Sequence, residues 1–148
     1  ARLPYTIQVL QEALRLCPPG ALNGRTAVRD IAVDGFRVEA GSMVGIGIYA
    51  LHRDPTLWEH PLEFDPDRFS PANSAGRNRW QYLPFGGGPR KCVGDHFAML
   101  EATLALATCV RHREISSLSN EFPVAVPFTT VAAAPIYARV TQRSGALR

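Results

Sequence analysis

A ten-residue stretch, Phe85–Gly94, constrains this chain more than any other segment. It contains three consecutive glycines, Pro89, two cations and Cys92, and it ends where an apolar helical pattern begins. Glycine permits backbone conformations that side chains forbid and lets a flat partner approach closely. The cations and the N-terminal N–H groups of the following helix favour the thiolate form of Cys92 over the thiol. The sequence alone therefore predicts that Cys92 is a metal ligand or a nucleophile, with a structural cysteine beside a glycine turn as the alternative.

The stretch resembles the haem-ligand loop of the cytochrome P450 family, the haem-thiolate monooxygenases. The family pattern is Phe-x-x-Gly-x-Arg-x-Cys-x-Gly, and its fixed positions are filled here by Phe85, Gly88, Arg90, Cys92 and Gly94. The resemblance implies a haem b cofactor with Cys92 as the axial iron ligand. The residues it places around the haem are Phe85, Gly86, Arg90, Cys92, Gly94 and Arg25, and the last of these would bind a propionate.

Composition limits the classes of protein and site that remain. The chain has 148 residues, 46% of them hydrophobic and 20% charged, which suits one domain with a core. A net charge of +3 is too small to suggest nucleic-acid binding, and no apolar run is long enough to span a bilayer. Three widely spaced cysteines argue against a disulfide framework or a zinc site. We therefore expect a reducing, cytoplasmic location.

Residues 4–16 show the spacing of an amphipathic helix, with Ile7, Leu10 and Leu14 on one face. Glu12 and Arg15 lie three residues apart, which in an arbitrary helix indicates an exposed ion pair of little weight. Here the pair resembles the family's Glu-x-x-Arg helix. The resemblance implies a buried structural network of Glu12, Arg15 and Arg68, the last from a proline-rich segment ending Pro66–Phe69.

Residues 26–50 are typical of a small antiparallel sheet. Asp34-Gly35 predicts a hairpin, and the apolar run 43–50 predicts a covered strand. Arg25 is expected just ahead of the first strand. By resemblance, the residues bordering the substrate cavity are Leu22, Asn23, Gly24, Thr129, Thr130 and Val131.

The C-terminal third begins with a second helix, predicted over residues 95–110. Its apolar residues lie nearly all round, which indicates burial in a large core and a packing role for Cys109. Short strands are predicted over residues 122–126 and 136–140.

These features predict a mostly α fold with small β-sheets, in which residues 1–148 form one partial domain: the C-terminal portion of the family fold. We expect a piece of a longer protein, because the oxygen-activating helix of the family has no counterpart and the chain holds no catalytic residue of its own. The resemblance implies insertion of one oxygen atom from O2 into a small organic or lipid-like substrate, with electrons from a ferredoxin or reductase. The donor would meet a basic face made of Arg77, Arg79, Arg90, Lys91 and Arg111.

Two alternatives remain open from the sequence. One is a catalytically inactive fragment with at most haem binding. The other is a haem-free domain with a nucleophilic or structural cysteine, for which a histidine base would be needed.

Overall fold

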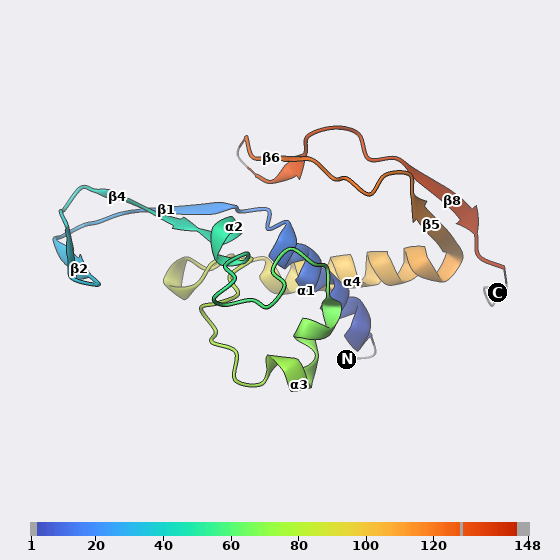
Figure 1. The fold of residues 1–148 in the computed structure, drawn as a ribbon, viewed down its shortest axis with the longest axis horizontal. Helices are drawn as coiled ribbons and strands as arrows, with labels where there is room; N and C mark the ends of the chain where they lie inside the picture. Colours follow the sequence, from blue (N-terminus) through green and yellow to red (C-terminus); the bar gives the residue numbers. More distant parts are fainter. Residues whose placement is uncertain (1–2, 128, 145–148) are drawn as a thin grey trace.

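The computed structural model describes residues 3–127 and 129–144, so parts of the predicted 1–148 domain lie outside the described residues. Helices α1 (Pro4–Leu16) and α4 (Asp95–His112) pack against each other at the centre of the molecule (Figure 1). Paired strands extend from this centre in two directions, and the connection between them winds beside α1. The combination of helices with small antiparallel sheets confirms the predicted fold class.

The two long helices meet through apolar side chains. Leu10 and Leu14 of α1 face Met99 and Ala102 of α4 around an apolar cavity of about 300 Å³. Helix α1 carries proline at its first position, where the missing N–H is harmless, and ends before Pro18, as predicted. The side of α4 that carries Ala98, Met99 and Ala102 is therefore the one that contacts α1.

The N-terminal strands form two separate ladders that project as an arm (Figure 1). Strand β1 (Leu22–Thr26) pairs antiparallel with β4 (Met43–Gly47), and β2 (Ile31–Val33) pairs with β3 (Phe36–Val38). The turn of the second ladder has positive φ at both Asp34 (48°) and Gly35 (81°). Those dihedrals suit a two-residue hairpin turn, so the predicted hairpin is confirmed.

Three sequence predictions in this region were wrong. The strand expected over 43–50 ends at Gly47, and Ile48–Leu51 forms the short helix α2. Strand β4 is mostly exposed rather than covered, because no described layer packs over a ladder of only two strands. Arg25 lies within β1 rather than ahead of it.

The segment between α2 and α4 has little regular structure. It contains the 3-10 turns η1 (Pro66–Phe69) and η2 (Gly88–Arg90) and the short helix α3 (Pro71–Ser74). We call residues 53–69 the meander. Prolines prevent a regular backbone hydrogen-bond ladder there, so its carbonyl groups need side-chain partners.

Of the two predicted C-terminal strands, one is shorter in the structure and the other is shifted. Strand β5 (Arg113–Ser117) pairs with β8 (Ala138–Gln142), and β6 (Val124–Ala125) pairs with β7 (Val131–Ala132). The strand predicted over 122–126 is thus only two residues long, and the one predicted over 136–140 starts two residues later. Strand β5 follows α4 directly, and no glycine or proline marks the change.

The most buried part of the described chain is polar. Glu12, Arg15 and His52 have 0% exposure, whereas only Ile48, Trp58 and Phe69 are buried among the large hydrophobic residues. Helix α4 packs on α1 with one face and exposes another, the row Phe97, Leu100 and Leu104. Cys109 is also exposed, so its predicted packing role was wrong. In residues 3–127 and 129–144, no helix is long and apolar enough to cross a bilayer.

Candidate functional site

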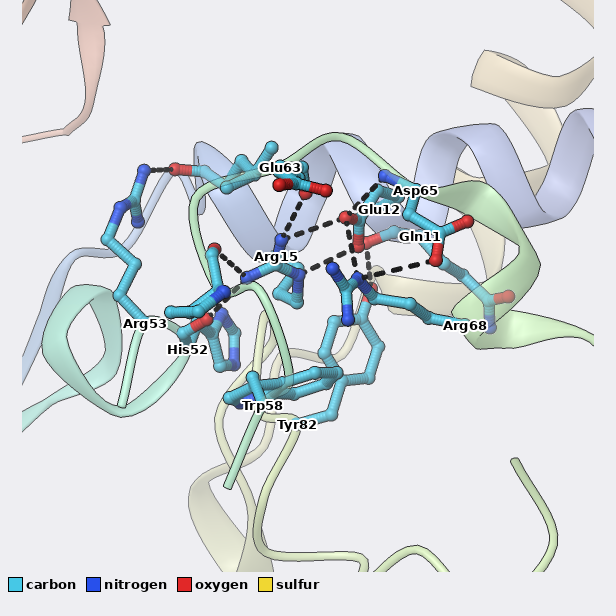
Figure 2. A network of polar contacts seen from close by, with 12 residues as sticks. Gln11, Glu12, Arg15, His52, Arg53, Trp58, Glu63, Asp65, Arg68 and Tyr82 are labelled. Carbon is cyan, nitrogen blue, oxygen red and sulfur yellow. Dashed lines mark hydrogen bonds and ion pairs between the residues drawn. The ribbon is translucent and has the colours of Figure 1, made fainter. Parts of the chain in front are cut away.

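The polar centre is built on a salt bridge between Glu12 and Arg15, one turn apart on α1 (Figure 2). Arg15 Nε lies 2.7 Å from Glu12 Oε2, and Arg15 Nη2 lies 2.8 Å from Glu12 Oε1. This bidentate arrangement uses the planar fork of the guanidinium, which adds geometric specificity. Because both side chains are fully buried, neither charge has water as an alternative partner.

Arg15 also ties the meander to α1. Its guanidinium donates to three backbone carbonyls, those of His52 (2.7 Å), Pro61 (2.6 Å) and Glu63 (3.0 Å). Arginine offers five N–H donors in fixed directions, and here they reach acceptors that no strand or helix satisfies. One side chain therefore fixes the path of a proline-rich segment.

Arg68 joins the same carboxylate from η1. Its Nε lies 3.3 Å from Glu12 Oε1, and its Nη2 donates to the carbonyl of His60 over 2.8 Å. The backbone N–H of Asp65 donates to Glu12 Oε1 over 2.9 Å. The structure thus brings together all three residues of the predicted network, which we call the Glu12 cluster (Glu12, Arg15, Arg68).

The cysteine loop closes through its own backbone. The N–H of Cys92 donates to the carbonyl of Phe85 over 2.9 Å, and η2 lies between them. Gly86 (φ 71°) and Gly88 (φ 69°) take left-handed conformations that favour glycine. The Cys92 side chain is exposed.

Cys92 lines a cavity of about 340 Å³ between the loop and β1. Four of the six residues predicted to bind haem line it: Phe85, Gly86, Arg90 and Cys92. Asn23, from the set predicted to border the substrate, completes the facing side. A Cβ added at Gly86 would lie 3.1 Å from Asn23 Nδ2, so glycine keeps this space open.

The other two predicted haem residues lie nearby without lining the cavity. Gly94 precedes α4, and a Cβ there would lie 3.9 Å from Cys92 Sγ. Arg25 is two residues from Asn23 on β1, so the two side chains share a face of the strand. Its Nη1 donates to the carbonyl of Gly24 over 2.7 Å. Leu22 and Gly24 fall on the opposite face.

Of the predicted substrate residues in the C-terminal part, only Thr130 is connected to the cavity among the described contacts, and it is connected through Pro19. Thr130 donates its hydroxyl to the carbonyl of Pro18 (2.6 Å) and its N–H to that of Pro19 (2.9 Å). Pro19 itself lines the Cys92 cavity. Thr129 is exposed, and Val131 begins β7.

The basic face predicted around Cys92 is smaller in the structure. The guanidinium of Arg77 packs on the rings of Trp58 (4.9 Å) and Phe69 (4.6 Å), so the side chain is partly buried rather than free at the surface. Arg111 stands near the far end of α4, roughly 24 Å beyond the first residue of that helix, because each helical residue advances about 1.5 Å. The prediction for both was wrong.

Among the remaining cations, Lys91 forms an ion pair with Asp95. The hydrogen bond from Lys91 lowers the pKa of Asp95, and the N–H of His96 adds to the effect. Arg90 lines the same cavity as Cys92, while the guanidinium of Arg79 lies 4.7 Å from the centre of the Trp80 ring.

Sequence reasoning missed His52 as a contributor to this region. His52 is fully buried, its Nε2 accepts the N–H of Leu83 over 2.8 Å, and its ring stacks on Tyr82 at 5.3 Å. Burial lowers its pKa to about 4 against a smaller opposing effect of the Arg15 backbone, and the positive charges of Arg15 and Arg53 lower it further. No periodic or spaced partner in the sequence pointed to this histidine.

Comparison with known proteins identifies the family. The family model for cytochrome P450 matches residues 1–134. The chain belongs to the cytochrome P450 family. It is 41% identical over 128 residues to cytochrome P450 4B1 of Rattus norvegicus, covering 86% of this chain and 25% of that protein. It is 53% identical over 106 residues to cyclooctatin synthase of Streptomyces melanosporofaciens, covering 72% and 23% respectively.

Solved structures give the same family. The chain matches a retinoic acid-bound cyanobacterial CYP120A1 with a TM-score of 0.89 and 33% identity, covering 96% of this chain and 33% of that one. The chain therefore spans about a quarter of the curated P450 relatives it matches and a third of the solved structure.

The residues around Cys92 fit the haem that the family implies. Cys92 offers an exposed sulfur, Phe85 an apolar surface, and Arg90 a cation that could pair with a propionate. The missing side chain at Gly86 leaves room for a flat group between the loop and Asn23.

Proposed function

We propose that residues 3–127 and 129–144 form the thiolate-side wall of a haem b site in a P450 monooxygenase. The observation that carries this proposal is the exposed Cys92 sulfur at a cavity shared with Phe85, Gly86 and Arg90. A haem held by a cysteine thiolate supplies oxygen activation, because the thiolate pushes electron density toward the iron and favours O–O cleavage.

The chain's own residues would bind and orient the cofactor. Cys92 would hold the iron through its exposed sulfur. Arg90 would pair with one propionate, and Arg25, on the same strand face as Asn23, would reach another. Phe85 would pack against the ring and exclude water from the sulfur.

The Glu12 cluster would act by positioning alone. It connects α1 to the meander through four hydrogen bonds: Arg15 donates to the carbonyls of Pro61 and Glu63, and Glu12 accepts the N–H of Asp65 and the guanidinium of Arg68. None of its three residues lines the Cys92 cavity. We assign no catalytic residue to this chain.

The proposed reaction is insertion of one oxygen atom from O2 into a small organic or lipid-like substrate. Asn23 lines the cavity, and Thr130 donates its N–H to Pro19, which also lines it; both contacts support a substrate-bordering role for that side. An acidic ferredoxin or reductase would supply electrons near Arg79 and Arg90, because opposite charges steer association. Three free cysteines support a reducing, cytoplasmic location.

Haem binding without turnover by this chain alone is a second candidate. It is favoured by the apolar row of α4, since Phe97 (71% exposed) and Leu100 (60%) leave a large unpartnered surface beside the site. A turnover assay on haem-loaded protein separates the two candidates.

The absorption spectrum of the reduced, carbon monoxide-bound protein tests the proposal. We expect the red-shifted band of thiolate-ligated haem. Cys92→Ser should abolish that band, whereas Cys17→Ser and Cys109→Ser should retain it. Failure to take up haem, or an unchanged band in Cys92→Ser, would refute the proposal and favour a haem-free role for the cysteine.

A further inference from the structure

His52 is hydrogen-bonded both to Arg15 of the Glu12 cluster and to Leu83, in the segment that enters the cysteine loop. Its backbone carbonyl accepts Arg15 Nη1 over 2.7 Å, and its Nε2 accepts the N–H of Leu83 over 2.8 Å. The carbonyl of Leu83 in turn accepts the N–H of Gly86 over 3.0 Å, and Gly86 lines the Cys92 cavity. A continuous set of hydrogen bonds therefore runs from the buried arginine to the loop.

The protonation state of His52 follows from these contacts. An Nε2 that accepts a hydrogen bond carries no proton, so the neutral ring holds its proton on Nδ1. In the part of the chain that the structure describes, Nδ1 is a buried atom without a hydrogen-bond partner. An unpaired buried donor is unfavourable. The favourable polar contact of this ring is therefore the hydrogen bond that Nε2 accepts from Leu83.

We propose that His52 is a positioning residue for the Cys92 loop: its neutral imidazole couples the Glu12 cluster to the segment that carries the sulfur. Tyr82 supports this placement from a second direction, because its ring stacks on His52 while its hydroxyl donates to the carbonyl of Gln11 on α1 over 2.9 Å. The segment entering the loop is thus fixed at consecutive residues, Tyr82 and Leu83.

Protonation of His52 would break this coupling. A charged imidazole donates from both nitrogens, so it could not accept the N–H of Leu83. The charged or titratable groups that face the ring are Arg15 on α1, Arg53 next along the chain and Tyr82 before the loop. The two arginines disfavour a further positive charge, so the neutral ring is the form that holds the loop at neutral pH.

The test uses the whole gene product that carries these residues, with two variants of His52 and one control. His52→Leu removes the acceptor while keeping an apolar side chain. His52→Gln replaces it with an amide oxygen that lies, like Nε2, two bonds beyond Cγ. Phe69→Leu is the control, because Phe69 is buried, packs on the same Tyr82 ring at 4.7 Å, and makes no hydrogen bond to the loop.

Amide hydrogen exchange on the haem-free protein measures the coupling itself. In His52→Leu we expect exchange at Leu83 and Gly86 to accelerate by about tenfold, the loss of one hydrogen bond. His52→Gln and Phe69→Leu should stay close to the unsubstituted protein at these two amides. Lowering the pH toward 4 should decrease the protection factor of the Leu83 amide, its intrinsic exchange rate at that pH divided by the observed rate, in the unsubstituted protein but not in His52→Gln. Equal exchange at Leu83 in His52→Leu and the unsubstituted protein would overturn the inference.

The haem-loaded protein gives the second measurement and depends on the proposed function. In folded His52→Leu, the fraction of carbon monoxide-bound haem that shows the thiolate band should fall by about half or more, because loss of the hydrogen bond to Leu83 makes the loop conformation about tenfold less favoured. In His52→Gln this fraction should recover. An unchanged fraction in His52→Leu would overturn the positioning role. Absence of the thiolate band in the unsubstituted protein would instead overturn the haem-thiolate function, while the exchange result would still decide the coupling.

Discussion

Glu12 and Arg15 form a fully buried salt bridge, with Nε of Arg15 2.7 Å from Oε2 of Glu12. Such a pair is unfavourable to bury unless every remaining donor and acceptor is also satisfied. Here the remaining donors of Arg15 meet carbonyls of the meander, and Oε1 of Glu12 meets Asp65 and Arg68. The salt bridge therefore organises a segment that has almost no regular structure of its own.

Arg68→Ala should give poorly folded protein without haem. The change leaves part of a buried carboxylate without its cation, which typically lowers the free energy of unfolding by about 3–5 kcal/mol. Chemical denaturation and haem content measure the effect. Arg37→Ala is the control, because Arg37 pairs with Asp30 on an exposed hairpin at 2.7 Å and should lose less than about 1 kcal/mol. Soluble Arg68→Ala with normal haem content would refute the network.

Glu12→Gln should be strongly destabilising, whereas Glu63→Gln should be close to neutral. The amide at position 12 would leave Arg15 buried without a counter-charge, again a loss of about 3–5 kcal/mol. Glu63 gives Arg15 only its backbone carbonyl, and its side chain is 71% exposed. Thermal unfolding of the two variants distinguishes them, and similar melting temperatures would contradict the assignment of the carboxylate.

These contacts show how far sequence could predict the site. Cys92, Arg90 and the Glu12 cluster could be found because fixed spacings mark them. The acceptors of Arg15 and Arg68 could not, since a backbone carbonyl has no residue signature. His52 was missed for a related reason: its partner is the N–H of Leu83, which any residue other than proline could supply.

The fold was predictable where a local signal exists. Helix α1 has an amphipathic face and a proline start, and the hairpin has its Asp34-Gly35 turn. The 43–50 run was misread because apolar, branched residues suit a strand and a short helix equally. The predicted end of α4, at residue 110, lies two residues before its actual end at His112, whereas the strand β5 that follows depends on pairing with the distant β8.

Protein stability should fall as pH decreases from about 6.5 to 4, and His52 should account for much of the change. Its pKa is lowered from 6.5 to about 4 by burial, so the unfolded chain binds a proton that the folded chain excludes. Stability from the neutral ring is complete above pH 6.5 and is lost toward pH 4, to a total of about 3 kcal/mol.

Unfolding measured at several pH values in the unsubstituted protein and in His52→Gln checks this prediction. The variant should show a flatter dependence between pH 6.5 and 4. Asp95 should contribute only at lower pH, because its already lowered pKa makes its stabilisation disappear below about pH 4. Identical pH profiles would contradict the assignment.

Gly86→Ala should weaken haem binding more than Gly24→Ala. At Gly86 a Cβ would be strained by a φ of 71° and would lie 3.1 Å from Asn23 Nδ2, at the cavity itself. Left-handed backbone disfavours alanine by roughly 1–2 kcal/mol, so haem affinity should fall by about tenfold. Gly24 has an ordinary φ and no atom within 4 Å of an added Cβ. Haem titration compares the two, and equal affinities would show that the loop conformation is not required.

X-ray absorption at the iron edge of the haem-loaded protein tests most directly whether Cys92 holds the iron. We predict one sulfur atom among the nearest neighbours of the iron, lost in Cys92→Ser and retained in Cys109→Ser. A neighbour set of nitrogen and oxygen only, or a sulfur that persists in Cys92→Ser, would contradict the haem-thiolate site.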